Sequence, residues 1–202
     1  MFGGDALVDV DLDDPTPDTG GTAVTNLDEY SDTARRGRLT ASEIMVLEMV
    51  EVDDASYTRS RSLLLMNAEQ KDDSKAVKRY LDQLMVLPEN TYDSVLLSKE
   101  ATWYVNTKRY QTALDKADKA ERYWARIPSP LVFQTKADIY ECQAASWQGL
   151  FYADGEDLDL LEHAITGWET YRRHVLTKNQ TEEAKRAEAQ IAKLEDVRKR
   201  LE

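Results

Sequence analysis

Residues 94–127 read SVLLSKEATWYVNTKRYQTALDKADKAERYWARI, and this stretch decides the fold class. In its first half, Leu97, Ala101 and Tyr104 are spaced by four and three residues, so they share one face of a helix. The second half repeats that kind of spacing with small residues, at Ala113, Ala117 and Ala120. Small residues allow a neighbouring helix to approach closely, so the stretch predicts a hairpin of two packed helices with its turn at 108–110.

The same pattern recurs about every 34 residues along the chain. A small residue stands near the start of the second helix of three predicted pairs, at Ser42, Ala76 and Ala113. A repeat of this length with one helical hairpin is typical of stacked helical repeats. We therefore predict an all-α protein, a right-handed α-solenoid of about four hairpins with a C-terminal capping helix. A globular helical bundle without a superhelix is the alternative.

Composition divides the chain into a leader at 1–22, a repeat domain at 23–176 and a capping helix at 177–202. Within the repeats we expect Thr40 and Glu43 to form a capping box, and Ser74 and Thr181 to be N-caps. The expected hairpins are 26–52 around Gly37, 57–87 ended by Pro88, 94–127, and 133–176 with its turn at Asp154-Gly155.

The leader is rich in aspartate, proline and glycine. Such a segment buries too little apolar area to offset the entropy of ordering, so we expect it to be flexible. The alternation at 7–12 also fits one short strand added to a partner's edge. Asp9, Asp11 and Asp13 have the spacing of a calcium loop, but Asp14 and Gly20 replace the Gly and Glu that a helix-flanked loop requires. We therefore predict no metal site, with weak divalent binding as the alternative.

The formal net charge of −12 and the pI near 4.7 argue against nucleic acid as a partner, because phosphate binding needs a basic surface. An acidic repeat protein favours basic or neutral partners, with association weakened by salt. No stretch approaches the roughly 18 apolar residues of a membrane span. No secretory signal is visible, so the compartment, cytoplasmic or periplasmic, stays open. Cys142 is the single cysteine, which excludes an internal disulfide.

The repeats resemble the tetratricopeptide repeat family over roughly residues 23–176. In 94–127, the residues on the family's spacing are Leu97, Ala101, Tyr104, Tyr110, Ala113, Ala117 and Ala120. Repeat 57–90 matches at Leu63, Leu64, Ala76, Tyr80 and Pro88, whereas repeat 23–56 is degenerate and the fourth repeat has a longer first helix. The resemblance implies a concave groove lined by the first helix of each pair.

Carried over residue by residue, the resemblance implies seven partner-binding positions: Arg61, Leu65, Glu69, Ser98, Thr102, Val105 and Asn106. They lack the Lys, Asn and Arg set by which some family members clamp a terminal carboxylate. We expect a non-catalytic scaffold or adaptor that binds a peptide or protein segment in this groove, without a cofactor. The alternative function is a self-assembling structural subunit of a larger envelope or organelle complex.

The sequence offers few residues arranged for metal binding or catalysis. His163 and His174 lie three helical turns apart, about 16 Å, which is too far to share one metal ion. His174 fits a contact at a helix C-terminus, and Cys142 fits a small buried residue. A hydrolase that uses His163 with nearby acids such as Glu162 is a third possibility.

Two further features leave alternatives open. Trp124 and Trp147 are the tryptophans that the repeat pattern does not require, so they fit either packing or ligand stacking. The last helix carries a heptad-like set at Ala184, Ala187, Ile191, Leu194 and Leu201. This set favours a capping helix, with a short dimerisation coiled coil as the alternative.

Overall fold

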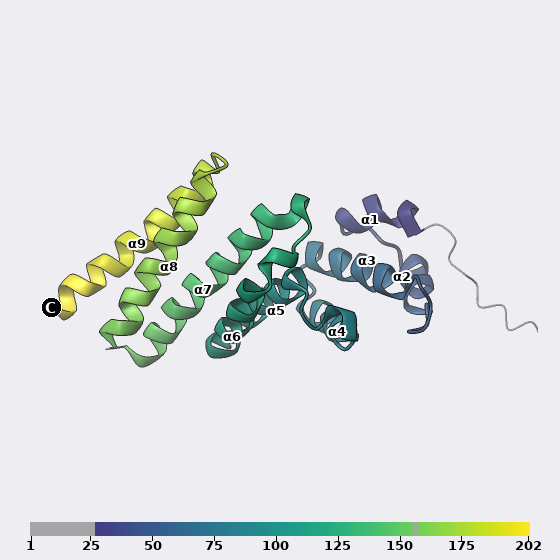
Figure 1. Cartoon of the computed structure of the whole chain (residues 1–202), viewed down its shortest axis with the longest axis horizontal. Helices are drawn as coiled ribbons and strands as arrows, with labels where there is room; N and C mark the ends of the chain where they lie inside the picture. Colours follow the sequence, from purple (N-terminus) through teal and green to yellow (C-terminus); the bar gives the residue numbers. More distant parts are fainter. Residues whose placement is uncertain (1–26, 156) are drawn as a thin grey trace, which may run out of the picture.

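The computed structural model describes residues 27–155 and 157–202, so the predicted leader and its strand and calcium alternatives lie outside the described residues. The described part consists of helices and connecting turns, without strands, and the helices follow one another along the long axis of the molecule (Figure 1). The α-helices are α1 (Ser31–Arg35), α2 (Ala41–Glu48), α3 (Tyr57–Gln70), α4 (Ser74–Met85), α5 (Ser94–Asn106), α6 (Tyr110–Arg122), α7 (Val132–Asp154), α8 (Leu158–Leu176) and α9 (Thr181–Leu201). Short 3₁₀ turns lie at Leu27–Tyr30, Pro88–Asn90, Trp124–Arg126 and Ser129–Leu131. None of these helices is both long enough and apolar enough to cross a bilayer.

The all-helical prediction is confirmed. Helices α3 and α4, α5 and α6, and α7 and α8 pack as hairpins, and α4 against α5, α6 against α7 and α8 against α9 link successive units. The first predicted hairpin differs, because α1 and α2 each pack against α3 and are not a packed pair in the described structure. The reason is length: α1 has only five residues, about one and a half turns, and cannot cover the face of α2.

Short polar side chains cap the starts of α2, α4, α5 and α8. Thr40 and Glu43 form the predicted capping box at the start of α2. The predicted caps Ser74 and Thr181 are wrong by one residue, because both are the first helical residue instead. Asp73 caps α4, where its carboxylate accepts a hydrogen bond from the Ala76 amide at 3.0 Å. Ser74 is not the cap, because the side chain of the aspartate before it reaches the free amides of the first turn.

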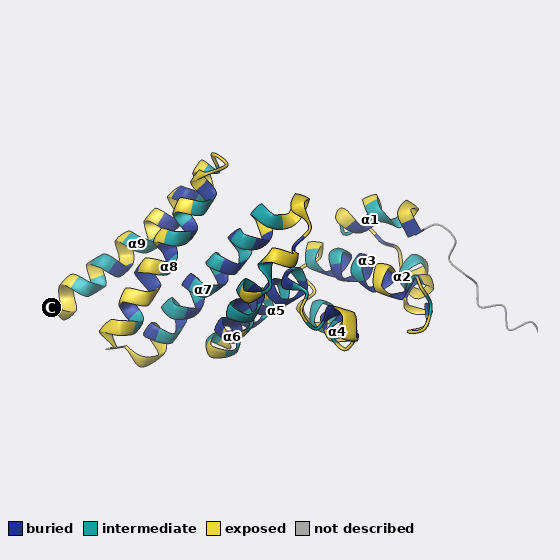
Figure 2. Cartoon of the chain, viewed as in Figure 1, coloured by how far each residue is buried: buried dark blue, intermediate teal, exposed yellow. Residues whose placement is uncertain are grey.

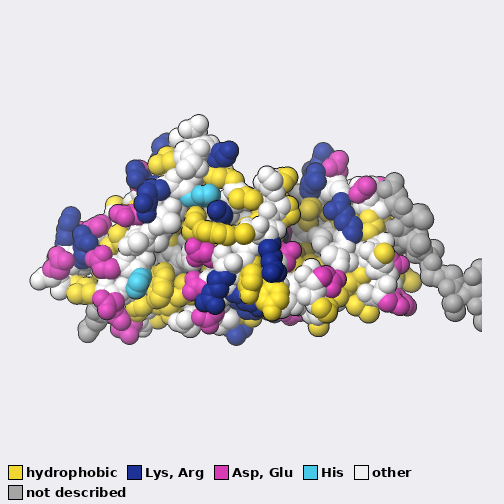
Figure 3. Space-filling model, in the orientation of Figure 1, with side chains coloured by type: hydrophobic (Ala, Val, Ile, Leu, Met, Phe, Trp, Pro, Cys, Tyr) yellow, Lys and Arg dark blue, Asp and Glu magenta, His cyan; other side chains and the backbone are white. Residues whose placement is uncertain are grey.

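Helices such as α6 and α9 bury one stripe of their surface and expose the opposite side, whereas α3, α5 and α7 bury residues on more than one face (Figure 2). On the face of the molecule that Figure 3 shows, basic side chains lie interspersed among acidic ones. The buried stripe of α6 is the one expected from sequence, since Ala113, Ala117 and Ala120 have no exposed surface. Burial of the stripes supplies most of the favourable free energy of such a fold, about 2 kcal/mol for each fully buried leucine.

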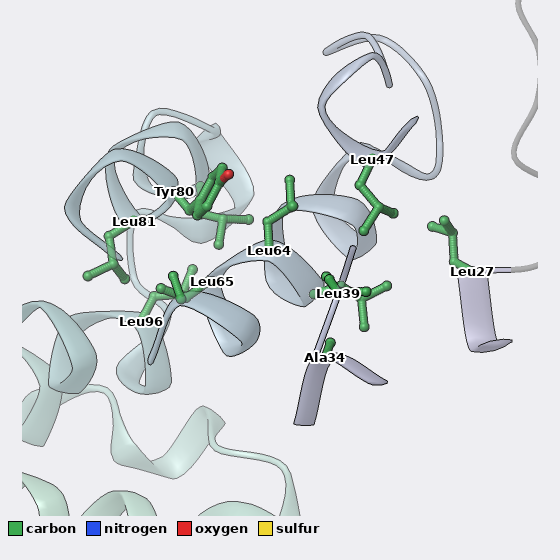
Figure 4. Close-up of a cluster of buried hydrophobic side chains, with 12 residues drawn as sticks. Leu27, Ala34, Leu39, Leu47, Leu64, Leu65, Tyr80, Leu81 and Leu96 are labelled. Carbon is green, nitrogen blue, oxygen red and sulfur yellow. The ribbon is translucent and has the colours of Figure 1, made fainter. Parts of the chain in front are cut away.

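The apolar core is divided into clusters that follow the stacking of the helices. The first cluster joins α1 to α4, with Leu64 and Leu65 of α3 between Leu47 of α2 and Leu81 of α4 (Figure 4). A second cluster joins α5, α6 and α7, and a third joins α7, α8 and α9. Each cluster takes side chains from successive hairpins, so neighbouring units stabilise one another.

Three of the described glycines permit close approaches that a side chain would block, and at Gly149 of α7 a Cβ would lie 2.5 Å from the ring of Tyr110. Gly37 has a φ of +64°, and a Cβ there would lie 2.9 Å from the Cβ of Gln70. Gly167 of α8 faces α7, where a Cβ would lie 2.9 Å from the Cα of Ala144. Because that Cα is backbone, it cannot turn away as a side chain can. The α7–α8 crossing therefore depends on the absence of a side chain at residue 167.

We predict that Gly167→Ala lowers the free energy of unfolding by about 1–2 kcal/mol, although alanine is the better helix former by about 1 kcal/mol. The physical reason is that α8 must move away from α7 to admit the methyl group. Denaturant unfolding followed by circular dichroism measures the change. Thr166→Ala, on the exposed side of the same turn, is the control and is expected to be neutral or stabilising. Equal stability of Gly167→Ala and wild type would contradict the tight crossing.

Candidate functional site

The structure separates the seven predicted partner-binding residues into two groups. Arg61, Leu65 and Ser98 are buried, so the prediction that they line an open groove is wrong for these three. Val105 is half-buried and packs against the cluster that joins α5, α6 and α7. The remaining three, Glu69, Thr102 and Asn106, lie at the surface and line the same pocket.

Arg61 has a structural role at the end of α2. Its side chain is 6% exposed, and its guanidinium donates hydrogen bonds to the carbonyl oxygens of Leu47 at 2.6 Å, Glu48 at 3.1 Å and Val50 at 3.0 Å. The same group lies 4.3 Å from the centre of the Tyr57 ring. The last carbonyls of a helix have no partner within the helix and carry partial negative charge, so a buried cation is favourable here.

On α3 and α5 the predicted face is correct at Glu69, Thr102 and Asn106 and wrong at Arg61, Leu65 and Ser98, which lie toward the core. On α3 the partly exposed face carries Ser62, Met66 and Glu69 rather than Arg61 and Leu65. On α5, Lys99 lines the pocket in place of the buried Ser98.

The pocket has a volume of about 520 Å³, and we call it the α5 groove. It opens between α3 and α5, the first helices of successive hairpins. Among the described helices, these two are not an extensively packed pair. α7, the first helix of the following hairpin, packs against α5 and contributes one residue. The groove is lined by Glu69, Asp72, Ser74, Val77, Lys99, Thr102, Trp103, Asn106 and Asp138.

One ion pair bridges the gap between α3 and α5. The ammonium of Lys99 donates to both carboxylate oxygens of Glu69, at 2.5 and 2.7 Å. Both side chains are about one third exposed, so the pair is partly screened and contributes roughly 1 kcal/mol or less to stability. Its main effect is on charge, because it neutralises the only cationic side chain that lines the described groove.

Asp138 of α7 is the carboxylate with the most perturbed environment in the groove. It accepts a hydrogen bond from the Gln134 side-chain amide at 2.8 Å and forms no ion pair with a described lysine or arginine. Burial raises the pKa of Asp138, and the carboxylate of Glu69 acts in the same direction. The Gln134 hydrogen bond and the ammonium of Lys99 oppose this rise in pKa.

Trp103 and Val77 form the apolar part of the groove. The indole Nε1 of Trp103 donates to the Ser74 carbonyl oxygen at 2.8 Å, which fixes the ring across the start of α4. Lys78 lies 5.6 Å from the centre of the indole ring and is ion-paired with Asp82, so this cation has its own partner. The groove thus combines carboxylates with an apolar wall.

Sequence reasoning missed the contributions of Asp138, Lys99 and Trp103, although one signal for Asp138 exists. Phe133 repeats the position of Leu97, so the register of Thr102 carried forward by one repeat reaches Asp138. Trp103 gave no signal, because an aromatic residue beside Tyr104 has the pattern of a packing residue.

The two histidines and the cysteine are not among the residues that line the α5 groove. The ring of His163 stacks on Trp147, and His174 stacks on Phe133 with its Nε2 at 2.9 Å from the Phe133 carbonyl oxygen. That contact is with α7 rather than with the C-terminus of its own helix. Cys142 is buried, and burial raises the pKa of its thiol to about 12, so the thiol is neutral near pH 7.

Trp124 interacts with a cation of the chain itself, since the Lys136 ammonium lies 3.9 Å from the centre of its ring. Among the described histidine, cysteine, aspartate and glutamate side chains, no three are grouped as metal ligands.

Comparisons with models of protein families, with curated proteins and with solved structures find no match. The function is therefore argued from the geometry of this chain.

We predict that Arg61→Ala destabilises the α2–α3 region by about 1–3 kcal/mol, because it leaves three carbonyl oxygens without donors. Amide hydrogen exchange is the suitable measurement, since it resolves local opening in a repeat protein. Exchange should accelerate in α2 and in the first turns of α3 and stay unchanged in α8 and α9. Arg61→Lys should give an intermediate effect, because one ammonium cannot serve three divergent carbonyls. Unchanged exchange in α2 would show that Arg61 does not stabilise the end of that helix.

Proposed function

We propose that this chain is a non-catalytic protein-interaction module, a right-handed solenoid of tetratricopeptide type, that holds a peptide or protein segment of a partner in the α5 groove. The observation that carries the proposal is the convergence of Glu69, Thr102 and Asn106 on one pocket. These residues come from the first helices of two successive hairpins, which is the arrangement that the family resemblance implies. A third first helix, α7, adds Asp138.

The form of the groove supports binding of an extended segment. It is lined by α3, α4, α5 and α7 together with the α3–α4 turn, so a bound chain would contact several hairpins at once. Asn106 offers an amide at its surface, and Val77 and Trp103 offer apolar area. The Thr102 hydroxyl donates to the Ser98 carbonyl oxygen, so this residue contributes mainly its position on the groove wall. Peptide recognition commonly combines such polar contacts with pockets for side chains.

The proposal predicts that Thr102→Arg abolishes binding of a segment selected for the groove. The long cation would lie across the groove and pair with its carboxylates, which excludes the ligand. A random peptide library is selected on the immobilised full chain, and the selected peptide is titrated by calorimetry against both proteins. We expect at least about a tenfold loss of affinity for the variant, which corresponds to roughly 1.4 kcal/mol.

Ala189→Arg is the matched control, because it places the same side chain on an exposed position of α9. It should leave the affinity unchanged. Selected peptides that bind Thr102→Arg as tightly as wild type would contradict binding in the α5 groove.

The N-terminal end of the stack favours a second candidate function, self-assembly as a structural subunit. Met45 and Met49 lie four residues apart on one side of α2, and Met49 is 71% exposed. Val52, which follows α2, is exposed as well. Clustered apolar side chains at the surface of a soluble domain are typical of an interface. The occupant in this reading is a second copy of the chain.

If this second function holds, the molar mass measured by sedimentation should rise with protein concentration in the micromolar range, and Met49→Lys should give a monomer throughout. The added ammonium would have to be buried without a partner in the interface, which is strongly unfavourable. Gln111→Lys, an exposed change of equal charge on α6, is the control and should still associate. A concentration-independent monomeric mass of the wild type would exclude this candidate.

A further inference from the structure

We propose that the α5 groove recognises a basic side chain, arginine or lysine, of the bound segment, with the carboxylate of Asp138 as its ion-pair partner. This inference rests on the proposed function, since it names the chemistry that the segment must present. It is carried by three observations: the charge of the groove, the surroundings of Asp138, and the apolar side chains that line the groove together with the carboxylates.

The charge of the groove is the first observation. Three carboxylates line it, those of Glu69, Asp72 and Asp138, against one ammonium, that of Lys99. The formal charge of the lining is therefore −2. Because Lys99 holds both oxygens of Glu69, its charge is already used, and Asp72 and Asp138 make up the excess. A cationic ligand group would neutralise part of this charge, whereas an anionic group would be repelled.

The surroundings of Asp138 are the second observation. The groove excludes part of the water from this carboxylate, and its described hydrogen-bond donor is a neutral amide, that of Gln134. A partly desolvated carboxylate without a cationic partner gains more from an incoming cation than a fully solvated one does. Asp115 on α6 shows the contrast, because it accepts the same kind of hydrogen bond from Gln111 at 3.1 Å but is fully at the surface.

The apolar wall is the third observation. Val77 and Trp103 line the groove together with the carboxylates. Lysine and arginine have a hydrocarbon stem that packs on apolar surface while the charged end reaches a polar partner. A small inorganic cation would leave this wall unused, so the combination fits a basic side chain better.

The proposal also implies a pH dependence. A cation pairs with the ionised form of Asp138, and the pKa of that carboxyl is raised by burial. Affinity should therefore be full above the raised pKa and decline as the pH falls through it. The charged groups that influence Asp138 are Lys99 of α5, Glu69 of α3 and Glu141 on its own helix. Asp138→Asn should remove the part of the decline that belongs to Asp138.

The test compares two peptides that differ in one charge, Ac-Gly-Leu-Arg-Leu-Gly-NH₂ and the same peptide with citrulline in place of arginine. Citrulline keeps the shape of arginine but is neutral, because a carbonyl oxygen replaces one NH₂ group of the guanidinium. Binding to the ¹⁵N-labelled full chain is followed by NMR at the Trp103 indole N–H, a resonance assigned with Trp103→Phe. We expect the arginine peptide to shift this resonance and to bind at least about fivefold more tightly than the citrulline peptide.

Two isosteric variants make the test specific. Asp138→Asn should weaken the arginine peptide by about fivefold and leave the citrulline peptide unchanged, whereas Asp115→Asn, with the same loss of charge, should alter neither affinity by more than about twofold. Circular dichroism of both variants controls for folding. Equal binding of the two peptides, lost with Thr102→Arg, would overturn charge recognition while the proposed groove function stands. No shift with either peptide at millimolar concentration would also overturn it, and the library selection then decides separately on the groove function.

Discussion

The structure depends on one constraint: a hairpin of this chain has apolar residues on more than one face and cannot bury them alone. Leu97 and Ala101 of α5 are buried in one cluster with Ala120 of α6 and Ile139 of α7, so three helices from two hairpins are needed to close it. The same holds at α8, whose buried face is shared between α7 and α9. An arrangement that satisfies this requirement is extended, because each hairpin packs against the next.

The groove forms because the first helices of successive hairpins are not all packed closely against one another. α5 packs on α6 and α7, whereas α3 and α5 are not one of the extensively packed pairs. Leu96 at the start of α5 shares a buried cluster with Leu65 of α3, and the Glu69–Lys99 ion pair bridges the two helices at the groove. Water can therefore reach the space between them, and polar residues can occupy it at a lower desolvation cost than in the core. The carboxylates that line the groove lie outside the buried clusters, whereas Val77 and Trp103 line the groove and also pack against the first cluster.

The hairpins could be predicted from the sequence because their signals are local. Small residues at helical spacing, the Thr40 cap and the turns at 108–110 and Asp154-Gly155 all act within a few residues. The side of α3 that faces the groove could not be predicted in the same way. Leu63, Leu64 and Leu65 are consecutive and all buried, so their periodicity does not select one face. Arg61 looks like a surface residue by type, yet the free carbonyls at the end of α2 place it inside, and that information is tertiary. Asp138 was predictable in position from the repeat register but not in burial, because its burial depends on how closely α7 approaches α5.

The net charge of the chain does not by itself explain the groove. Two acids elsewhere that are buried or half-buried have cationic partners: Glu100 is buried with Lys116 at 2.7 Å, and Glu141 meets Arg186 at 2.8 Å. These contacts offset the cost of desolvation within the fold. Asp138 differs from these two, since it is partly desolvated and its described donor is neutral. Asp118 and Glu121 also accept hydrogen bonds from a neutral amide, that of Gln143, but they do not line the α5 groove. The position of Asp138 at the wall of an open pocket is therefore what fits the proposed ion pair with a cation of a bound segment.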